Sequence, residues 1–341
     1  MSRTQPNTRR PPSVMMSHLL NVTGDARLWL NFCASMAGFQ LTELGMESPE
    51  ISRVGVALTL MRHSEPVMAE ASRFAKRLNA SLTLIHVGTS EAESRAHLDE
   101  AANRLSIPHE HHIVWNQQDP AQALLKAAEQ SGVELLVMGA FEGPAINRRR
   151  FLGPVARRLA ESARCSLLLL VHPRVEKHDF RRIVAITDFS ECSQVACRQA
   201  MWLAERGCAD WLRIVSIHTV FMDVRAELQA RDGRPARTRA EEHALMENFV
   251  AELPDSTVSV DSEVIDATTG FAACDYAEAR EADLLVLPGH NRPEGRVPPM
   301  ANWALQVVPS NLWIVHCGPA WNQPETAGHS SASRGASPSA T

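Results

Sequence analysis

One order of short apolar runs and amphipathic segments occurs twice in this chain of 341 residues, and this duplication limits the folds open to it. Short apolar runs predict buried strands, and apolar residues spaced three and four positions apart predict helices. The first copy has predicted strands at 54–60, 82–87, 110–115, 134–138 and 167–171, and helices at 65–78, 92–105, 119–131 and 155–162. The second copy has predicted strands at 182–187, 213–218, 258–265, 283–287 and 311–316, and helices at 190–206, 240–253 and 270–281.

Single residues also recur at matching places in the two copies. The pairs are Ser64 and Ser190, His86 and His218, Gly139 and Gly289, and His172 and His316. So long a spacing indicates duplicated domains rather than the short repeats of a solenoid. Strands that alternate with helices and are apolar on both faces predict a parallel sheet covered on both sides. We therefore predict an α/β chain with two doubly wound parallel-sheet domains in tandem.

The composition changes at both ends of the duplicated region. Residues 1–13 are rich in proline and arginine, and residues 322–341 are rich in serine, alanine, glycine and proline. Such segments have little to bury. We predict a partly disordered N-terminal extension at 1–50, a first domain at 51–175, a second domain at 176–319 and a disordered tail at 320–341. Residues 176–180 form a short linker, so the two domains should pack together.

Composition excludes several classes of protein. The hydrophobic fraction of 45% fits a globular protein, and the formal net charge of −5 gives no broad basic surface for nucleic acid. The longest apolar runs are too short to cross a bilayer, and the basic start of the chain is not followed by the apolar core of a signal peptide. We expect a cytoplasmic protein with no membrane or nucleic-acid partner.

Seven cysteines occur at irregular spacing and without a CxxC pair. This pattern indicates neither a disulfide framework nor a zinc knuckle. We expect the cysteines to be small buried apolar residues of a reducing compartment.

The sequence offers no recognisable catalytic set. Three histidines cluster at His109, His111 and His112, but no carboxylate or cysteine pattern accompanies them, so we predict no metal site. The chain also lacks the GxSxG, HExxH and GxxxxGK[ST] motifs. We therefore expect a protein that is not an enzyme.

Two stretches resemble the universal stress protein family. Residues 183–204 (IVAITDFSECSQVACRQAMWLA) resemble its first strand that ends in Asp, with a Ser close behind and an alanine-rich helix. Residues 135–155 (LLVMGAFEGPAINRRRFLGPV) resemble its apolar strand, glycine loop and following helix start. The resemblance spans residues 51–318 and implies two domains of the adenine-nucleotide α-hydrolase type.

The resemblance places a glycine-rich phosphate loop in the first domain, at Gly139, Gly143 and Gly153. Glycines let a backbone come close to phosphate and ribose, and N–H groups at the following helix start face the anion. Gly139 stands one residue too far from Gly143 for the family spacing, and Pro154 replaces the Ser or Thr after Gly153. Proline removes both a hydroxyl and an N–H group.

The other implied contacts divide between the domains. Val87 stands at the adenine-contacting place of the first domain, and Thr219 at that of the second. Asp188 keeps the first-strand acid in the second domain, whereas Arg62 stands at that place in the first. An Asp after a strand can equally build a turn or cap the next helix. The second domain has lost its glycine loop, with Pro298 and Pro299 at its end.

The resemblance implies a stress-response protein with a regulatory ATP or other adenine-nucleotide site that needs no turnover, at Val87, Gly139, Gly143, Gly153 and Asp188. Two alternatives remain: a nucleotide-free interaction module and a weak ATP hydrolase. The family also implies that the closing strands 167–171 and 312–316 pair the two domains as an intramolecular version of a dimer, with a homodimer of whole chains as a further option.

Overall fold

The computed structural model of the protein describes residues 51–59, 64–88, 91–108, 110–115, 119–140, 152–171, 173–219, 238–269, 271–289 and 299–317. The chain divides into two units, Met1–Glu47 and Ser48–Thr341, and the described residues all lie in the second. The predicted extension at 1–50 and tail at 320–341 lie outside the described residues, as do Arg62, Gly143 and His172.

The predicted order of strands and helices is confirmed apart from one additional helix, α11 (Pro299–Gln306), with bounds that move by a few residues. The first repeat contains β1 (Arg53–Leu58), α3 (Ser64–Leu78), β2 (Ser81–Gly88), α4 (Glu91–Arg104), β3 (Glu110–Trp115), α5 (Pro120–Gln130), β4 (Leu135–Gly139), α6 (Pro154–Ser162) and β5 (Ser166–Leu170). The second contains β6 (Arg182–Ile186), α7 (Glu191–Gly207), β7 (Trp211–Thr219), α9 (Arg239–Ala251), β8 (Val260–Ala267), α10 (Ala272–Ala279), β9 (Leu284–Gly289), α11 (Pro299–Gln306) and β10 (Asn311–His316).

Helix starts follow simple local chemistry. Asp119 caps α5 through its side chain, which accepts bonds from the N–H groups of Ala121 and Gln122, and Pro120 takes the first helical position. Helix α11 was not predicted from the sequence. The two prolines near its start favour a loop. Proline nevertheless fits the first turn of a helix, because an N–H group at that position would have no intrahelical partner.

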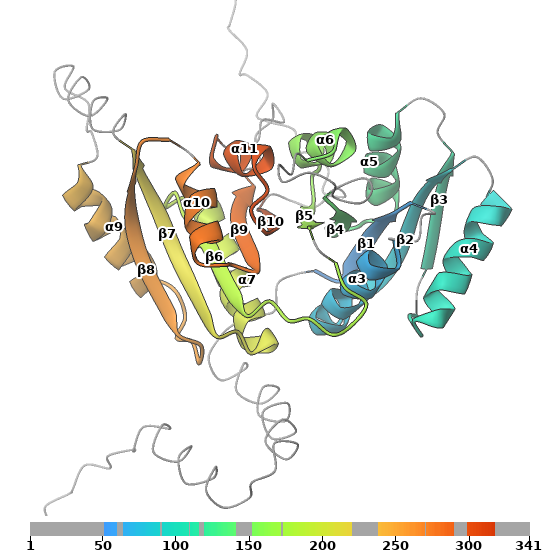
Figure 1. Cartoon of the computed structure of the whole chain (residues 1–341), viewed down its shortest axis with the longest axis horizontal. Coiled ribbons are helices and arrows are strands. Elements are labelled where there is room, and N and C mark those ends of the chain that lie inside the picture. The colour runs from blue at the N-terminus through green and yellow to red at the C-terminus, as the bar shows by residue number, and fades with distance from the viewer. Residues whose placement is uncertain are drawn as a thin grey trace, which may run out of the picture. The chain divides into compact units, whose positions relative to one another are not determined.

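All the described strands form one ten-stranded sheet in the order β3-β2-β1-β4-β5-β10-β9-β6-β7-β8. Each repeat contributes five neighbouring strands in the same internal order, and Figure 1 shows the two halves side by side. Pairing is parallel throughout, except between β5 and β10, which meet antiparallel. The predicted doubly wound fold is confirmed, and the closing strands join the repeats into one sheet.

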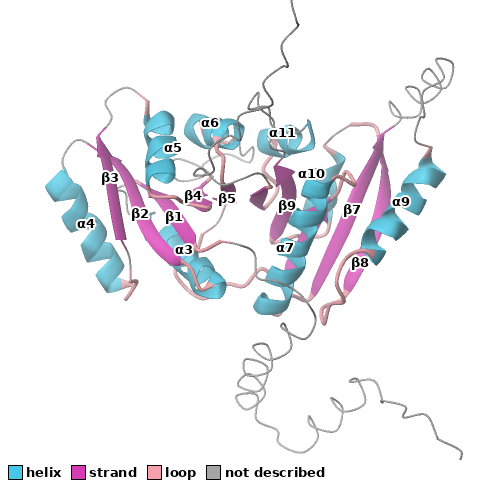
Figure 2. Cartoon of the chain, turned by 180° about the vertical axis from the view of Figure 1, so that it is seen from behind, coloured by secondary structure: helices cyan, strands magenta, loops and turns pink. Residues whose placement is uncertain are grey.

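Helices flank the sheet, as Figures 1 and 2 show from opposite sides. One core cluster contains buried residues of α5, α6, α10 and α11 together with alternate residues of the central strands. Helices α3, α4, α7 and α9 contribute no residue to it and contact β1, β3, β9 and β8, so they cover the other face. Because both faces are covered, β5 is buried along its whole length.

Side chains close both ends of the β5–β10 seam. Leu167, Leu168 and Leu169 pair with Ile314, Trp313 and Leu312. The Val171 N–H donates to Asn311 Oδ1 at 2.8 Å, and the His316 N–H donates to Ser166 Oγ at 3.0 Å. The fully buried Trp313 meets Phe74 of α3 edge-on, with ring centroids 5.5 Å apart, and Phe74 also contacts Phe180 of the linker at 6.1 Å. The seam therefore ties together both repeats and the linker.

A carboxylate caps the start of the first strand in each repeat. Glu134 Oε2 accepts the Ser52 and Arg53 N–H groups at 2.5 and 2.9 Å. Asp283 Oδ2 accepts the Arg181 and Arg182 N–H groups at 3.1 and 2.9 Å.

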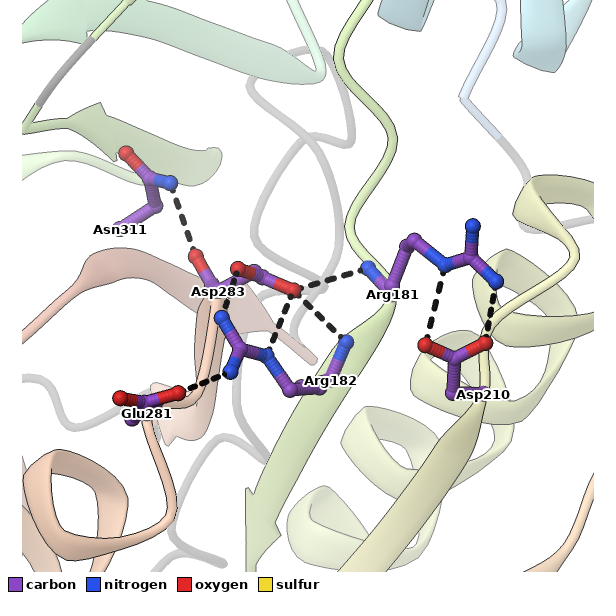
Figure 3. Close-up of polar contacts among 6 residues, drawn as sticks. All are labelled: Arg181, Arg182, Asp210, Glu281, Asp283 and Asn311. Atoms are coloured by element: carbon purple, nitrogen blue, oxygen red, sulfur yellow. Dashed lines mark hydrogen bonds and ion pairs between the residues drawn. The ribbon is translucent and has the colours of Figure 1, made fainter.

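Asp283 also anchors neighbouring groups in the second repeat. The Arg182 guanidinium binds Asp283, and the Asn311 side-chain amide donates to the Asp283 carbonyl oxygen at 2.8 Å (Figure 3). The hydrogen bond to Asp283 raises the pKa of Arg182. These bonds tie the starts of β6, β9 and β10 together.

We expect Asp283→Ala to lower the free energy of unfolding by about 2 kcal/mol, because several N–H donors lose a charged acceptor. Glu281→Ala is the matched control, since Glu281 binds the same guanidinium but its side chain is 79% exposed. That change should cost under about 1 kcal/mol. Urea titrations of both variants measure the difference, and equal losses would contradict the capping role of Asp283.

Candidate functional site

The strand order reverses between β1 and β4 in the first repeat and between β6 and β9 in the second. In open α/β sheets, ligands bind outside the carboxyl ends of the strands at such a reversal. Val87 and Gly139 lie at the carboxyl ends of β2 and β4, and Asp188 follows β6. The topology thus places these residues of each repeat at the appropriate edge of its half of the sheet.

In the first repeat, the described ends of the glycine loop meet. Gly139 is half-buried and pairs with Leu170, and the Ala140 N–H donates to the Leu170 carbonyl at 2.8 Å. The Gly153 N–H then donates to the Ala140 carbonyl at 3.3 Å, so Gly153 returns to the end of β4. Gly143 lies between these ends, outside the described residues.

The start of α6 has few N–H groups to offer an anion. Gly153 is the N-cap residue and has no side-chain cap, and its own N–H is engaged by Ala140. Pro154 occupies the first helical position and has no N–H. Val155 and Ala156 carry the remaining N–H groups of this first turn, next to the positive end of the helix dipole.

In the second repeat, Asp188 takes part in the turn between β6 and α7. The Asp188 side chain is exposed, and its Oδ1 accepts bonds from the N–H and hydroxyl groups of Ser190 at 3.1 and 2.5 Å. Ser190 in turn caps α7, because its Oγ accepts the Ser193 N–H at 3.2 Å. The structure places Asp188 where the turn interpretation requires it.

The same turn contains a strained residue. Phe189 has φ of 63°, in the left-handed region that side chains other than glycine seldom adopt. Its N–H donates to Thr187 Oγ1 at 3.0 Å, and Thr187 Oγ1 lies 2.9 Å from Ser193 Oγ. The Phe189 ring meets Phe249 of α9 edge-on at 5.9 Å. These contacts hold the turn, and with it the Asp188 carboxylate, in one geometry.

A buried histidine precedes the adenine-contacting place in each repeat. His86 precedes Val87, and its Nδ1 lies 2.9 Å from the Leu58 carbonyl oxygen at the end of β1. His218 precedes Thr219, and its Nδ1 lies 2.7 Å from Glu242 Oε2 in α9. The repeated histidines thus occupy a shared structural position, but they have different partners.

Glu242 is the residue of this region that the sequence did not reveal. Its side chain is 2% exposed, and the His218 side chain is 3% exposed. A carboxylate in the first turn of a helix ordinarily faces solvent, so the residue type did not indicate that Glu242 is buried. The available signal was its position on the same helix face as Met246 and Phe249, both buried.

Gly289 of the second repeat is explained by packing. A Cβ at this position would lie 2.8 Å from Ile314 Cγ2 and 3.0 Å from the Val315 carbonyl oxygen. β10 therefore approaches β9 too closely for a side chain here, whatever the loop beyond it does. Gly289 and His316 are register partners at the carboxyl ends of these strands.

The expectation that all the cysteines are buried apolar residues is wrong for three of them. Cys192 and Cys317 are joined by a disulfide, because the packing of α7 against β10 brings their Cα atoms within 5.4 Å. Cys208 is exposed at the end of α7. Cys197 and Cys274 are buried thiols, and burial raises the pKa of both, that of Cys274 to about 12.

The described part of the chain contains neither a candidate metal-ligand group nor a candidate membrane-spanning helix. No three or more His, Cys, Asp or Glu side chains gather there as metal ligands. His109 lies outside the described residues, and the side chains of His111 and His112 are not described. None of the described helices is long and apolar enough to span a bilayer.

Comparison with known proteins identifies the family. The model of the universal stress protein family matches residues 88–171 and again residues 179–300. A comparison with curated proteins gives no significant match.

Solved structures share the fold across both repeats. A functionally unknown protein from Pseudomonas aeruginosa PAO1 has a TM-score of 0.56 at 14% identity, over 78% of this chain and 92% of its own. A universal stress protein from Archaeoglobus fulgidus DSM 4304 has a TM-score of 0.53 at 15% identity, over 79% of this chain and 100% of its own. The twofold family match, over one ten-stranded sheet, shows that this chain belongs to the universal stress protein family as a tandem two-domain member.

Proposed function

We propose that this protein acts in the stress response by binding an adenine nucleotide in its first repeat, without turnover. The observation that carries the proposal is that the two described ends of the glycine loop meet, through the bond from the Gly153 N–H to the Ala140 carbonyl oxygen. The carboxyl end of β2, with Val87, lies at the same edge of the sheet. An occupied site would change the surface that a partner meets at this edge of the sheet.

The phosphate end of this pocket is the weaker part. Gly153 has already used its N–H, Pro154 has none, and no hydroxyl stands at either place. Binding free energy should therefore come mainly from the adenosine portion. We infer that ATP binds little better than AMP, in contrast to a pocket that grips each phosphate with N–H groups.

A nucleotide-free interaction module is the second candidate, and Asp188 favours it. The carboxylate at the family's nucleotide-contacting place serves the turn through Ser190. Helix α11 of the second repeat begins with Pro299, as α6 begins with Pro154, so both helix starts lack an N–H. The hydrolase alternative gains no support from the described residues.

Three further parts of the proposal concern organisation. The domain division at 175 and 176 follows the duplicated pattern, and the linker beside it packs on the Phe74 ring through Phe180. The β5–β10 seam supports an intramolecular pseudo-dimer, because it pairs equivalent strands of the two repeats. We also propose a cytoplasmic location, which cell fractionation would test.

We expect Gly153→Ala to weaken nucleotide binding. Gly153 has φ of −59°, which alanine adopts easily, so the added methyl group should leave the fold intact and obstruct the nucleotide. We expect calorimetry to show affinity for AMP and ATP falling about tenfold, or about 1.4 kcal/mol.

Gly207→Ala is the matched control, since a Cβ there would meet its nearest neighbour at 3.9 Å. Nucleotide released from the denatured wild-type protein would support the site directly. No released nucleotide and no heat with ATP at about millimolar concentration would favour the interaction module. ATP hydrolysis that Gly153→Ala abolishes would favour the enzyme.

We expect Pro154→Ser to strengthen ATP binding, because it restores an N–H and a hydroxyl at the start of α6. Hydrogen bonds to charged groups contribute about 1.5 to 3 kcal/mol, so the affinity for ATP should rise by about tenfold or more. AMP affinity should rise less. Pro299→Ser makes the same change in α11 and should leave both affinities unchanged. If the two variants behave alike, the phosphate end does not lie at α6.

Substitution of Asp188 separates its interpretation as a turn residue from its interpretation as a nucleotide contact. Asp188→Ala removes the acceptor of two Ser190 bonds and should lower the free energy of unfolding by about 1 kcal/mol. AMP and ATP affinities should stay at the wild-type values, because the proposed pocket lies in the first repeat. Stability is measured by urea titration and affinity by calorimetry. A loss of nucleotide binding without a loss of stability would assign Asp188 to the site.

A further inference from the structure

The Cys192–Cys317 pair lies at the carboxyl edge of the second repeat. Cys192 is the second residue of α7, two residues after the cap Ser190, and Cys317 directly follows β10. β6, β9 and β10 run parallel, so the end of β10 lies at the same edge of the sheet as Asp188 and Gly289. The bond joins residues 125 positions apart in the sequence.

We propose that Cys192 and Cys317 form a reversible disulfide, a redox modification site that reacts with small disulfides of the glutathione class. This inference is independent of nucleotide binding. It assigns to the second repeat a chemistry that the first cannot share, because Pro66 and Pro173 hold the matching positions.

The exchange balances without a metal or a bound cofactor. The Cys317 thiolate attacks one sulfur of oxidised glutathione, its S–S bond breaks, and one glutathione thiolate leaves. The Cys192 thiolate then attacks the Cys317 sulfur of the mixed disulfide and releases the second glutathione. Two protein thiols are oxidised, one glutathione disulfide is reduced, and the two thiol protons end on the released glutathiones.

Exposure supports this order of attack. Cys317 is half-buried and within reach of a small disulfide, whereas Cys192 is only 8% exposed. Cys197, farther along α7, is fully buried and has a raised pKa, so it stays out of the exchange.

The surroundings also suit the reduced pair. Cys317 Sγ lies 3.4 Å from the carbonyl oxygens of both Cys192 and Val315. Cys192 Sγ lies 3.9 Å from the Val315 carbonyl oxygen. Each thiol would therefore have an acceptor after reduction, so opening the bond leaves no buried donor unpaired.

Oxidation would fasten two segments that border the candidate site of the second repeat. One is the first turn of α7, whose Ser190 and Ser193 hold Asp188 and Thr187. The other is the end of β10, against which Gly289 packs without room for a Cβ. We therefore expect the oxidised protein to hold the Asp188 turn more rigidly than the reduced protein.

The test equilibrates the full-length protein in buffers of reduced and oxidised glutathione, alkylates the thiols and maps peptides by mass spectrometry. We expect Cys192 and Cys317 to lose alkylation together and to return when reduced glutathione is added without denaturant. Amide exchange at 187–193 should slow on oxidation. Thiols that stay alkylatable at every ratio would overturn the proposal, and so would a bond that opens only after unfolding, because it would then be a permanent cross-link.

Serine variants test the assigned order. Cys192→Ser should trap glutathione on Cys317, because the resolving thiol is gone, whereas Cys317→Ser should leave Cys192 unmodified. Cys208→Ser is the matched control. Cys208 is exposed at the C-terminal end of α7, and its substitution should not affect the oxidation of Cys192 and Cys317. Glutathione trapped on Cys192 in the Cys317→Ser variant would overturn the order of attack.

Discussion

The antiparallel pairing of β5 with β10 is the contact on which the rest of the structure depends. Each strand closes its own repeat, and β5 is buried along its whole length, so without the pairing each strand would be an exposed edge prone to association. Pairing turns two five-stranded halves into one sheet and buries Trp313 against Phe74. The outer edge at β8 instead carries exposed Asp261, Ser262 and Glu263, which discourage further pairing.

Duplication preserved the scaffold while the strand ends diverged. Both repeats use a carboxylate to cap the first strand and a buried histidine at the end of the second, yet His86 binds a backbone carbonyl and His218 binds Glu242. Such positions are retained because they satisfy buried polar groups.

The second repeat combines these features at one edge. Its turn at Asp188 is held by Ser190 and by the left-handed Phe189, and the disulfide fastens the helix that follows. The first repeat has neither device described at its own edge, where the loop from Gly139 returns to Gly153. The two repeats therefore share one scaffold but differ in the described residues at this edge of the sheet.

The sequence by itself determined the duplicated strand–helix order, except for α11, and the doubly wound fold, because periodicity is a local property. It located Val87, Gly139, Gly153 and Asp188 at strand ends and helix starts through family resemblance. Only the tertiary structure decided three contacts. Glu242 is buried beside His218, the Gly153 N–H donates to the Ala140 carbonyl oxygen, and Cys192 forms a disulfide with Cys317. These contacts join residues remote in the sequence, so their partners depend on how the elements pack and not on any local pattern.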